Sequence, residues 1–161
     1  MNTYHRINKY SNMKCKMLGV CDMVSEKLSI MKDLPLLAMR LVLAYGFWKP
    51  GMMKWNDIEG IGSWFESMGY PLPLMNAYAA ATTEVAGAVL LLLGFATRLI
   101  SIPLMVIMLV AIFTVHGANG FEAGSNGYEI PLYYLIMLFT ITIYGGGRIS
   151  LEGLFRKISS K

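Results

Sequence analysis

An apolar stretch that carries three positive charges constrains this chain more than any other feature. Residues 34–55 read LPLLAMRLVLAYGFWKPGMMKW, which is long and apolar enough to cross about 30 Å of hydrocarbon. Each charge inside such a span costs at least about 2.5–3.5 kcal/mol. At helical spacing, one stripe of the segment carries Arg40, Ala44, Phe47, Gly51 and Lys54. Because this stripe joins two cations to small residues, we expect it to pack against protein and not against lipid.

Three further apolar segments follow, and we expect them to cross the bilayer at residues 74–96, 99–116 and 130–144. The last is short at about 1.5 Å per residue and needs its flanks to span. Hydrophobic residues make up 55% of the 161 and cluster in these runs, which is unusual for a soluble domain. The chain is therefore predicted to be all-α, a polytopic membrane protein whose residues 34–155 form a four-transmembrane-helix bundle.

The residues before and after the bundle are basic. Residues 1–33 lack the apolar run and the cleavage site of a signal peptide, and their apolar residues recur at helical spacing. We interpret the segment as an amphipathic helix in the inner headgroup layer, with a solvated basic tail as the alternative. Residues 156–161 form a second basic tail. Cys15 and Cys21 match neither a redox CxxC motif nor a zinc pair, so we expect two reduced thiols.

Basic residues outside the spans lie on one side of the predicted topology. Six precede the first span, Arg98 lies in the second loop, and four follow the last span. The other two loops carry five acidic residues and only Lys54, at a span boundary. By the positive-inside rule, both termini are therefore predicted to be cytoplasmic. The net charge of +4 suits an anionic membrane surface, and no nucleic acid partner is expected.

Glu84 is a single acid near the middle of the second apolar segment, where an unpaired charge is costly. At about 1.5 Å per residue, Arg40 lies about 9 Å and Glu84 about 18 Å from the cytoplasmic edge. An arginine side chain can span most of that gap, and Lys54 approaches from the other side. We therefore expect Glu84 to pair with either Arg40 or Lys54. In the alternative interpretation, the pair only fixes the register of two helices.

A second polar cluster is expected at the outer ends of the spans. Lys54 ends the first segment, His116 ends the third and Glu129 starts the fourth, with tyrosines close to it. These residue types suit a quinone head group, and they also form ordinary interfacial belts, so both interpretations stay open. In the first, Glu84 or His116 would carry protons, because imidazole titrates near neutral pH and a buried carboxyl group can hold a proton.

Thirteen methionines raise the question of copper, since thioether and imidazole ligands suit Cu(I). The candidate ligands would be Met52, Met53, Met105, Met108 and His116. They form no tightly spaced array in a loop, and methionine commonly packs apolar helices. We therefore expect packing and no metal site. The sequence also has no P-loop and no dinucleotide-binding glycine motif.

With these residues in place, residues 34–155 resemble the DoxX family of small four-helix membrane proteins. The resemblance rests on motifs in a fixed order: Arg40, Phe47, Gly51 and Lys54; Gly69-Tyr70-Pro71; Glu84, Gly87 and Leu93-Gly94-Phe95; Thr97-Arg98; Asn119-Gly120-Phe121; Asn126-Gly127-Tyr128-Glu129; and Gly145 to Leu154. The chain departs from the family pattern at Ala44, Gly146 and Glu152, where the family often has Gly, Pro and Asp.

The resemblance implies a bundle in the plasma (inner) membrane, because relatives are linked to redox systems there, including a thiosulfate:quinone oxidoreductase and complexes that handle oxidative or thiol stress. We therefore expect an integral-membrane subunit of a redox system. Its quinone site would be shaped by Arg40, Lys54, Glu84, His116 and Glu129. A partner oxidoreductase would supply electrons, because the sequence offers no evident cofactor site of its own.

The alternative is a non-enzymatic scaffold or a small transporter in metal or oxidative-stress tolerance. Enzymatic activity and oligomeric state, a homo-oligomer included, stay open.

Overall fold

The computed structural model describes residues 31 and 33–159. The chain divides into two units between residues 35 and 36, and the second unit, residues 36–161, is compact. The amphipathic helix predicted within residues 1–33 lies almost entirely outside the described residues. The second unit contains the elements that form the candidate site.

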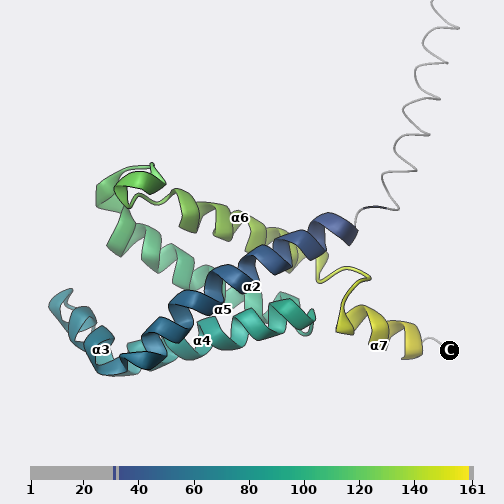
Figure 1. The fold of residues 1–161 in the computed structure, drawn as a ribbon, viewed down its shortest axis with the longest axis horizontal. Coiled ribbons are helices and arrows are strands. Elements are labelled where there is room, and N and C mark those ends of the chain that lie inside the picture. The colour runs from purple at the N-terminus through teal and green to yellow at the C-terminus, as the bar shows by residue number, and fades with distance from the viewer. Residues whose placement is uncertain (1–30, 32, 160–161) are drawn as a thin grey trace, which may run out of the picture. The chain divides into compact units, whose positions relative to one another are not determined.

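The described residues are helical, with no strand among them. The helices are α2 (Asp33–Asn56), α3 (Ile58–Ser67), α4 (Pro73–Leu93), α5 (Thr97–Val110), α6 (Glu129–Tyr144) and α7 (Leu151–Ser159). Three short segments connect α5 to α6: η1 (Ala111–His116), η2 (Gly117–Asn119) and η3 (Ala123–Ser125). Figure 1 shows α3 and these short segments at one end of the second unit and α7 at the other. The all-α prediction is confirmed.

Among the described residues, two helices are both long and apolar enough to cross a membrane: α4 and the continuous segment Thr97–Asn119. Only 33% of the first apolar window and 17% of the second is buried, whereas a core helix of a soluble protein is mostly buried. Large apolar side chains on the second segment face outward, with Leu99 73% and Phe113 78% exposed. α6 is apolar but has 16 residues, and α2 is long but less apolar because of its charges. Spanning by α2 and α6 stays a prediction.

The turn between α4 and α5 begins earlier than the predicted limit at residue 96. Gly94 adopts a left-handed φ of +70°, and its N–H donates to the carbonyl of Leu90 at 2.9 Å. Glycine favours this C-cap because it lacks the Cβ atom that makes the left-handed region costly. Helix α5 then begins at Thr97, so a three-residue turn joins the two helices.

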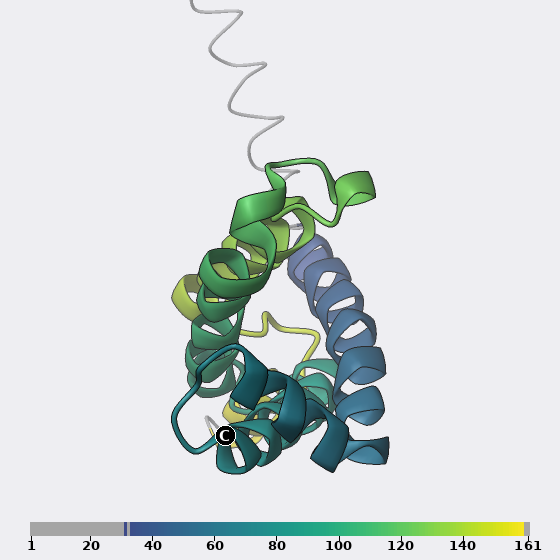
Figure 2. The same ribbon diagram turned by 90° about the vertical axis from the view of Figure 1, so that its left-hand side faces the viewer.

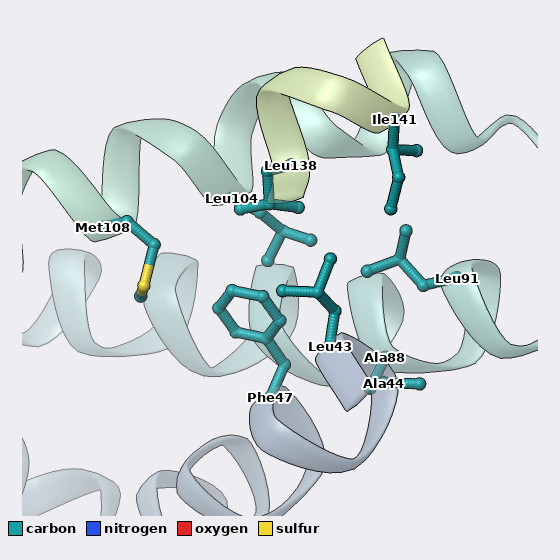
Figure 3. Close-up of a cluster of buried hydrophobic side chains, with 9 residues drawn as sticks. All are labelled: Leu43, Ala44, Phe47, Ala88, Leu91, Leu104, Met108, Leu138 and Ile141. Atoms are coloured by element: carbon teal, nitrogen blue, oxygen red, sulfur yellow. The ribbon is translucent and has the colours of Figure 1, made fainter. Parts of the chain in front are cut away.

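Four helices contribute side chains to one apolar core (Figure 3). Its members are Leu43, Ala44 and Phe47 of α2, Ala88 and Leu91 of α4, Leu104 and Met108 of α5, and Leu138 and Ile141 of α6. The buried residues of α2 include Arg40, Phe47 and Gly51, so the predicted stripe is its packing face. Met108, a candidate copper ligand by sequence, is 8% exposed and packs in this core. In the end-on view of Figure 2, α2 lies on the side of the unit opposite α5.

Candidate functional site

A cavity of about 700 Å³ lies between α2, α3, α4, α5 with η1, and α6. Most of its lining is apolar, as at Phe47, Val106 and Ile130. The polar and aromatic part of the lining includes Lys54, Trp64, Tyr70, Glu84, His116 and Tyr134. An apolar cavity with a few converging polar groups is the usual form of a small-molecule site.

Lys54 of α2 and Glu84 of α4 form an ion pair on the cavity wall. Lys54 Nζ lies 2.7 Å from Oε2 and 3.0 Å from Oε1 of Glu84. The Glu84 side chain is 4% exposed and that of Lys54 15%. The two helices approach closely because Gly51 carries no side chain: a Cβ atom there would lie 2.9 Å from Cγ2 of Val85. The pair cancels both charges, so this part of the wall carries no net charge.

Arg40 does not pair with Glu84, so that alternative is wrong. Its guanidinium group belongs to a side chain that is 1% exposed, and it donates to four backbone carbonyls. These are Leu91 at 2.8 Å, Leu92 at 3.0 Å, Gly146 at 2.8 Å and Ile149 at 2.7 Å. The first two lie in the last turn of α4, where the helix dipole favours a cation. Arg40 therefore ties α2 to α4 and to the segment after α6, and it does not line the cavity.

His116 reaches the cavity from the end of η1. Its Nδ1 atom lies 2.8 Å from the carbonyl oxygen of Asn126. A carbonyl oxygen only accepts hydrogen bonds, so Nδ1 carries the proton. The other nitrogen, Nε2, therefore presents a lone pair when the imidazole is neutral. This is the only described hydrogen bond of the His116 ring, and it leaves Nε2 available to a ligand.

The segment η1 is a π-helix, which the sequence pattern did not predict. The hydroxyl of Thr114 donates to the carbonyl of Val110, the last residue of α5, at 2.7 Å. Tyr70 donates its own hydroxyl to Thr114 at 2.6 Å, which links the chain after α3 to the π-helix. π-Helices are frequent at functional sites, because their wider turn redirects side chains. Here the wider turn ends at His116.

Aromatic rings form a second part of the wall. On α3 and the residues after it, Phe65 packs against Trp64 at 5.4 Å and against Tyr70 at 5.2 Å between ring centroids. Across the cavity, Tyr134 of α6 meets Phe47 edge to face at 5.5 Å. The hydroxyl of Tyr134 has no hydrogen-bond partner among the described residues, and its lining position makes it available to a ligand.

Glu129 lies at the start of α6 and does not line the cavity. Its Oε2 atom accepts from the N–H of Ala123 at 3.0 Å, and Oε1 accepts from the hydroxyl of Tyr133 at 3.0 Å. Glu129 therefore closes the loop that precedes α6. Of the five predicted site residues, the structure brings three together around one cavity: Lys54, Glu84 and His116.

Several cavity residues escaped the sequence analysis as site residues. Trp64 and Phe65 had no role assigned from the sequence, and Tyr70 appeared only within a family motif. Tyr134 was grouped with the tyrosines near Glu129 without a role of its own. Within the residues that the structure describes, no three His, Cys, Asp or Glu side chains gather as metal ligands would.

Comparison with known proteins gives a family and several relatives. The family model for DoxX matches residues 35–117. An uncharacterized protein of Haemophilus influenzae is 30% identical over 148 residues, which cover 89% of this chain and 91% of that protein. A Bacillus subtilis protein named "Putative oxidoreductase CatD" is 34% identical over 79 residues, 49% of this chain and 58% of that protein. No solved structure matches.

Proposed function

This chain belongs to the DoxX family of membrane proteins, and from that premise we propose that it is an integral-membrane subunit of a redox system that binds a quinone head group. The observation that carries the proposal is the cavity of about 700 Å³, in which an ion pair, an imidazole and a tyrosine hydroxyl meet apolar walls. Its volume falls within the range of roughly 300–1,000 Å³ that is usual for ligand sites.

The lining chemistry suits a planar, uncharged ring with an apolar tail. Because Glu84 neutralises Lys54, this part of the wall attracts a small anion only weakly. An uncharged head group binds there without the desolvation penalty that a charged ligand carries. Lys54 uses two of its three N–H groups on Glu84, so one donor remains for a ring oxygen. The aromatic rings of Phe47 and Tyr134 can pack against a flat ring.

When bound, a quinone supplies the electron-accepting chemistry, and a partner oxidoreductase supplies the electrons. The residues of this chain would bind and orient the ring, exclude water and hold protons. His116 holds a proton at Nδ1 and offers Nε2, and Glu84 offers a carboxylate within the apolar wall. The name of the Bacillus subtilis relative supports a redox role, since it describes an oxidoreductase.

The proposal includes a placement in the membrane. α2 and α6 would join α4 and α5 as spans of the plasma (inner) membrane, with both termini in the cytoplasm. The support is the clustering of basic residues before α2, at Arg98 and after α6. Labelling of single cysteines in intact cells tests this topology. Substitutions Gly124→Cys and Ser160→Cys, in a chain with Cys15 and Cys21 replaced by serine, should react with an impermeant reagent only at residue 124.

Quinone binding by the purified protein in nanodiscs tests the ligand. The wild type should bind a short-chain ubiquinone saturably, and Glu84→Gln should weaken binding on the order of tenfold, because it leaves Lys54 charged and unpaired. The matched control is Glu66→Gln, which makes the same change on the exposed side of α3. A folded wild type that binds no quinone contradicts the proposal and favours the non-enzymatic scaffold.

A further inference from the structure

The free hydrogen-bonding groups of the cavity include two fixed acceptors. His116 is the first, because its Nδ1–H is committed to the carbonyl of Asn126 at 2.8 Å. That carbonyl also accepts from the side chain of Asn119 at 3.2 Å. The loop around it is closed by a hydrogen bond from Gly127 N–H to the carbonyl of Glu122 at 2.9 Å. The neutral ring of His116 therefore has only the lone pair of Nε2 for a ligand.

Asn76 is the second fixed acceptor. Its Nδ2 atom donates to the carbonyl of Pro71 at 2.6 Å, which assigns the amide orientation because a carbonyl cannot donate. The residue lines the cavity, and no described hydrogen bond uses its Oδ1 atom. The free donors on the wall include the third N–H of Lys54 and the hydroxyl of Tyr134. A ligand that both donates and accepts thus satisfies more of the wall than one that only accepts.

We propose that this cavity selects the reduced, hydroxyl-bearing form of the ring ligand, a hydroquinone, over the quinone. The inference rests on the proposed function, since it concerns the same cavity. The oxygens of a quinone only accept hydrogen bonds. When a quinone displaces water from the cavity, the lone pair on Nε2 of His116 therefore loses its hydrogen-bond donor and gains no other. A hydroquinone donates one O–H to Nε2 of His116 and accepts from Lys54 or Tyr134 through its oxygens. Leaving one buried acceptor unpaired corresponds to a loss of affinity on the order of tenfold.

The test is a pair of titrations of the full-length protein in nanodiscs, without oxygen, at about pH 8, where a free imidazole is neutral. The probes are decylubiquinol and decylubiquinone, which differ only in the two hydroxyl hydrogens. The wild type should bind the quinol on the order of tenfold more tightly. In His116→Asn, the shorter amide keeps a donor for the Asn126 carbonyl and removes the acceptor at Nε2. Its preference for the quinol should fall toward one, because the bound quinone no longer leaves an unpaired acceptor and should bind more tightly.

A structural readout accompanies the titrations. Amide hydrogen exchange at Gly127 and Tyr128 should match the wild type in His116→Asn, which shows that the loop has kept its hydrogen bonds. Equal wild-type affinities for the two forms overturn this inference and leave the proposed function standing. A quinol preference that persists in His116→Asn with an intact loop overturns the role given to Nε2. A folded wild type that binds neither form overturns both proposals.

Discussion

Lys54 and Glu84 lie 30 positions apart on α2 and α4, and both carboxylate oxygens of Glu84 lie within 3.0 Å of the lysine nitrogen. The pair joins two helices at the wall of the cavity, so it influences both the stability of the fold and the electrostatics of the site. The two effects can be separated. The stability of the fold depends on the pairing of the two charges, whereas ligand binding depends on the charge and the hydrogen-bonding groups that the two side chains present to the cavity.

The first prediction concerns the pairing of these two charges. Removing one charge leaves the other buried, so Lys54→Gln and Glu84→Gln should each lower the free energy of unfolding by about 3–5 kcal/mol. The double variant restores a neutral, hydrogen-bonded pair and should recover much of the loss. Thermal unfolding of the four proteins in one detergent measures the coupling. Additive losses in the double variant would show that the two residues act independently.

The second prediction concerns Arg40, whose guanidinium group donates to four carbonyls from α4 and the segment after α6. Lysine keeps the charge but has one nitrogen, which cannot reach carbonyls on both sides. Arg40→Lys should therefore destabilise the protein by about 3 kcal/mol, which corresponds to two lost hydrogen bonds to a charged group. Arg98→Lys is the control, since that side chain is exposed. Equal unfolding temperatures for the two variants would contradict the role assigned to Arg40.

Arg40 also explains which part of the structure could be predicted from the sequence. The cost of charge in an apolar helix correctly indicated that Glu84 needs a partner, and it left two candidates. The choice depended on where α4 ends: Leu91 and Leu92 place free backbone carbonyls beside Arg40, and so this cation needs no carboxylate. Backbone acceptors leave no mark in the sequence. Distance along the membrane normal alone could not separate the two alternatives.

The cavity itself was only partly predictable, for a similar reason. Lys54, Glu84 and His116 were recognised by charge and by their places at the ends or middle of apolar segments. The aromatic wall depends on how α3 and its following turn fold back, which apolar periodicity does not fix. The π-helix before His116 has no Pro or Gly within Ala111–His116 to signal it. Its hydrogen bond to Tyr70 is a tertiary contact across 44 positions.

The third prediction tests the close approach of α2 and α4. A Cβ atom at Gly51 would lie 2.9 Å from Cγ2 and 3.1 Å from the backbone nitrogen of Val85, and backbone cannot move aside cheaply. Gly51→Ala should therefore cost about 1–3 kcal/mol by overpacking. Gly124→Ala is the matched control, because nothing lies within 4 Å of a Cβ atom there. Similar stabilities for these two variants, measured by thermal unfolding, would show that the helices can separate without penalty.

The fourth prediction tests whether the π-helix positions His116. Phe113 lies within η1, is 78% exposed and does not line the cavity, so its deletion removes the extra residue and little packing. The segment should then close into an α-helix, and Thr114 should lose its hydrogen bond from Tyr70. Because residues 114–116 rotate with it, the bond from His116 to Asn126 should break. The preference for the quinol over the quinone should fall toward one, and amide exchange in the loop after His116 should accelerate.

Phe113→Ala is the control for this deletion, since it removes the same side chain and keeps the residue count of the π-helix. Its loop exchange and its preference for the quinol should match the wild type, because the Phe113 ring faces outward. Tyr70→Phe provides an intermediate case, in which the π-helix keeps its length and loses one hydrogen bond. Graded effects, from the alanine variant through Tyr70→Phe to the deletion, follow if the backbone of η1 sets the direction of the imidazole. If the deletion leaves both measurements unchanged, His116 is held by the Asn126 carbonyl alone, and the π-helix has no part in positioning it.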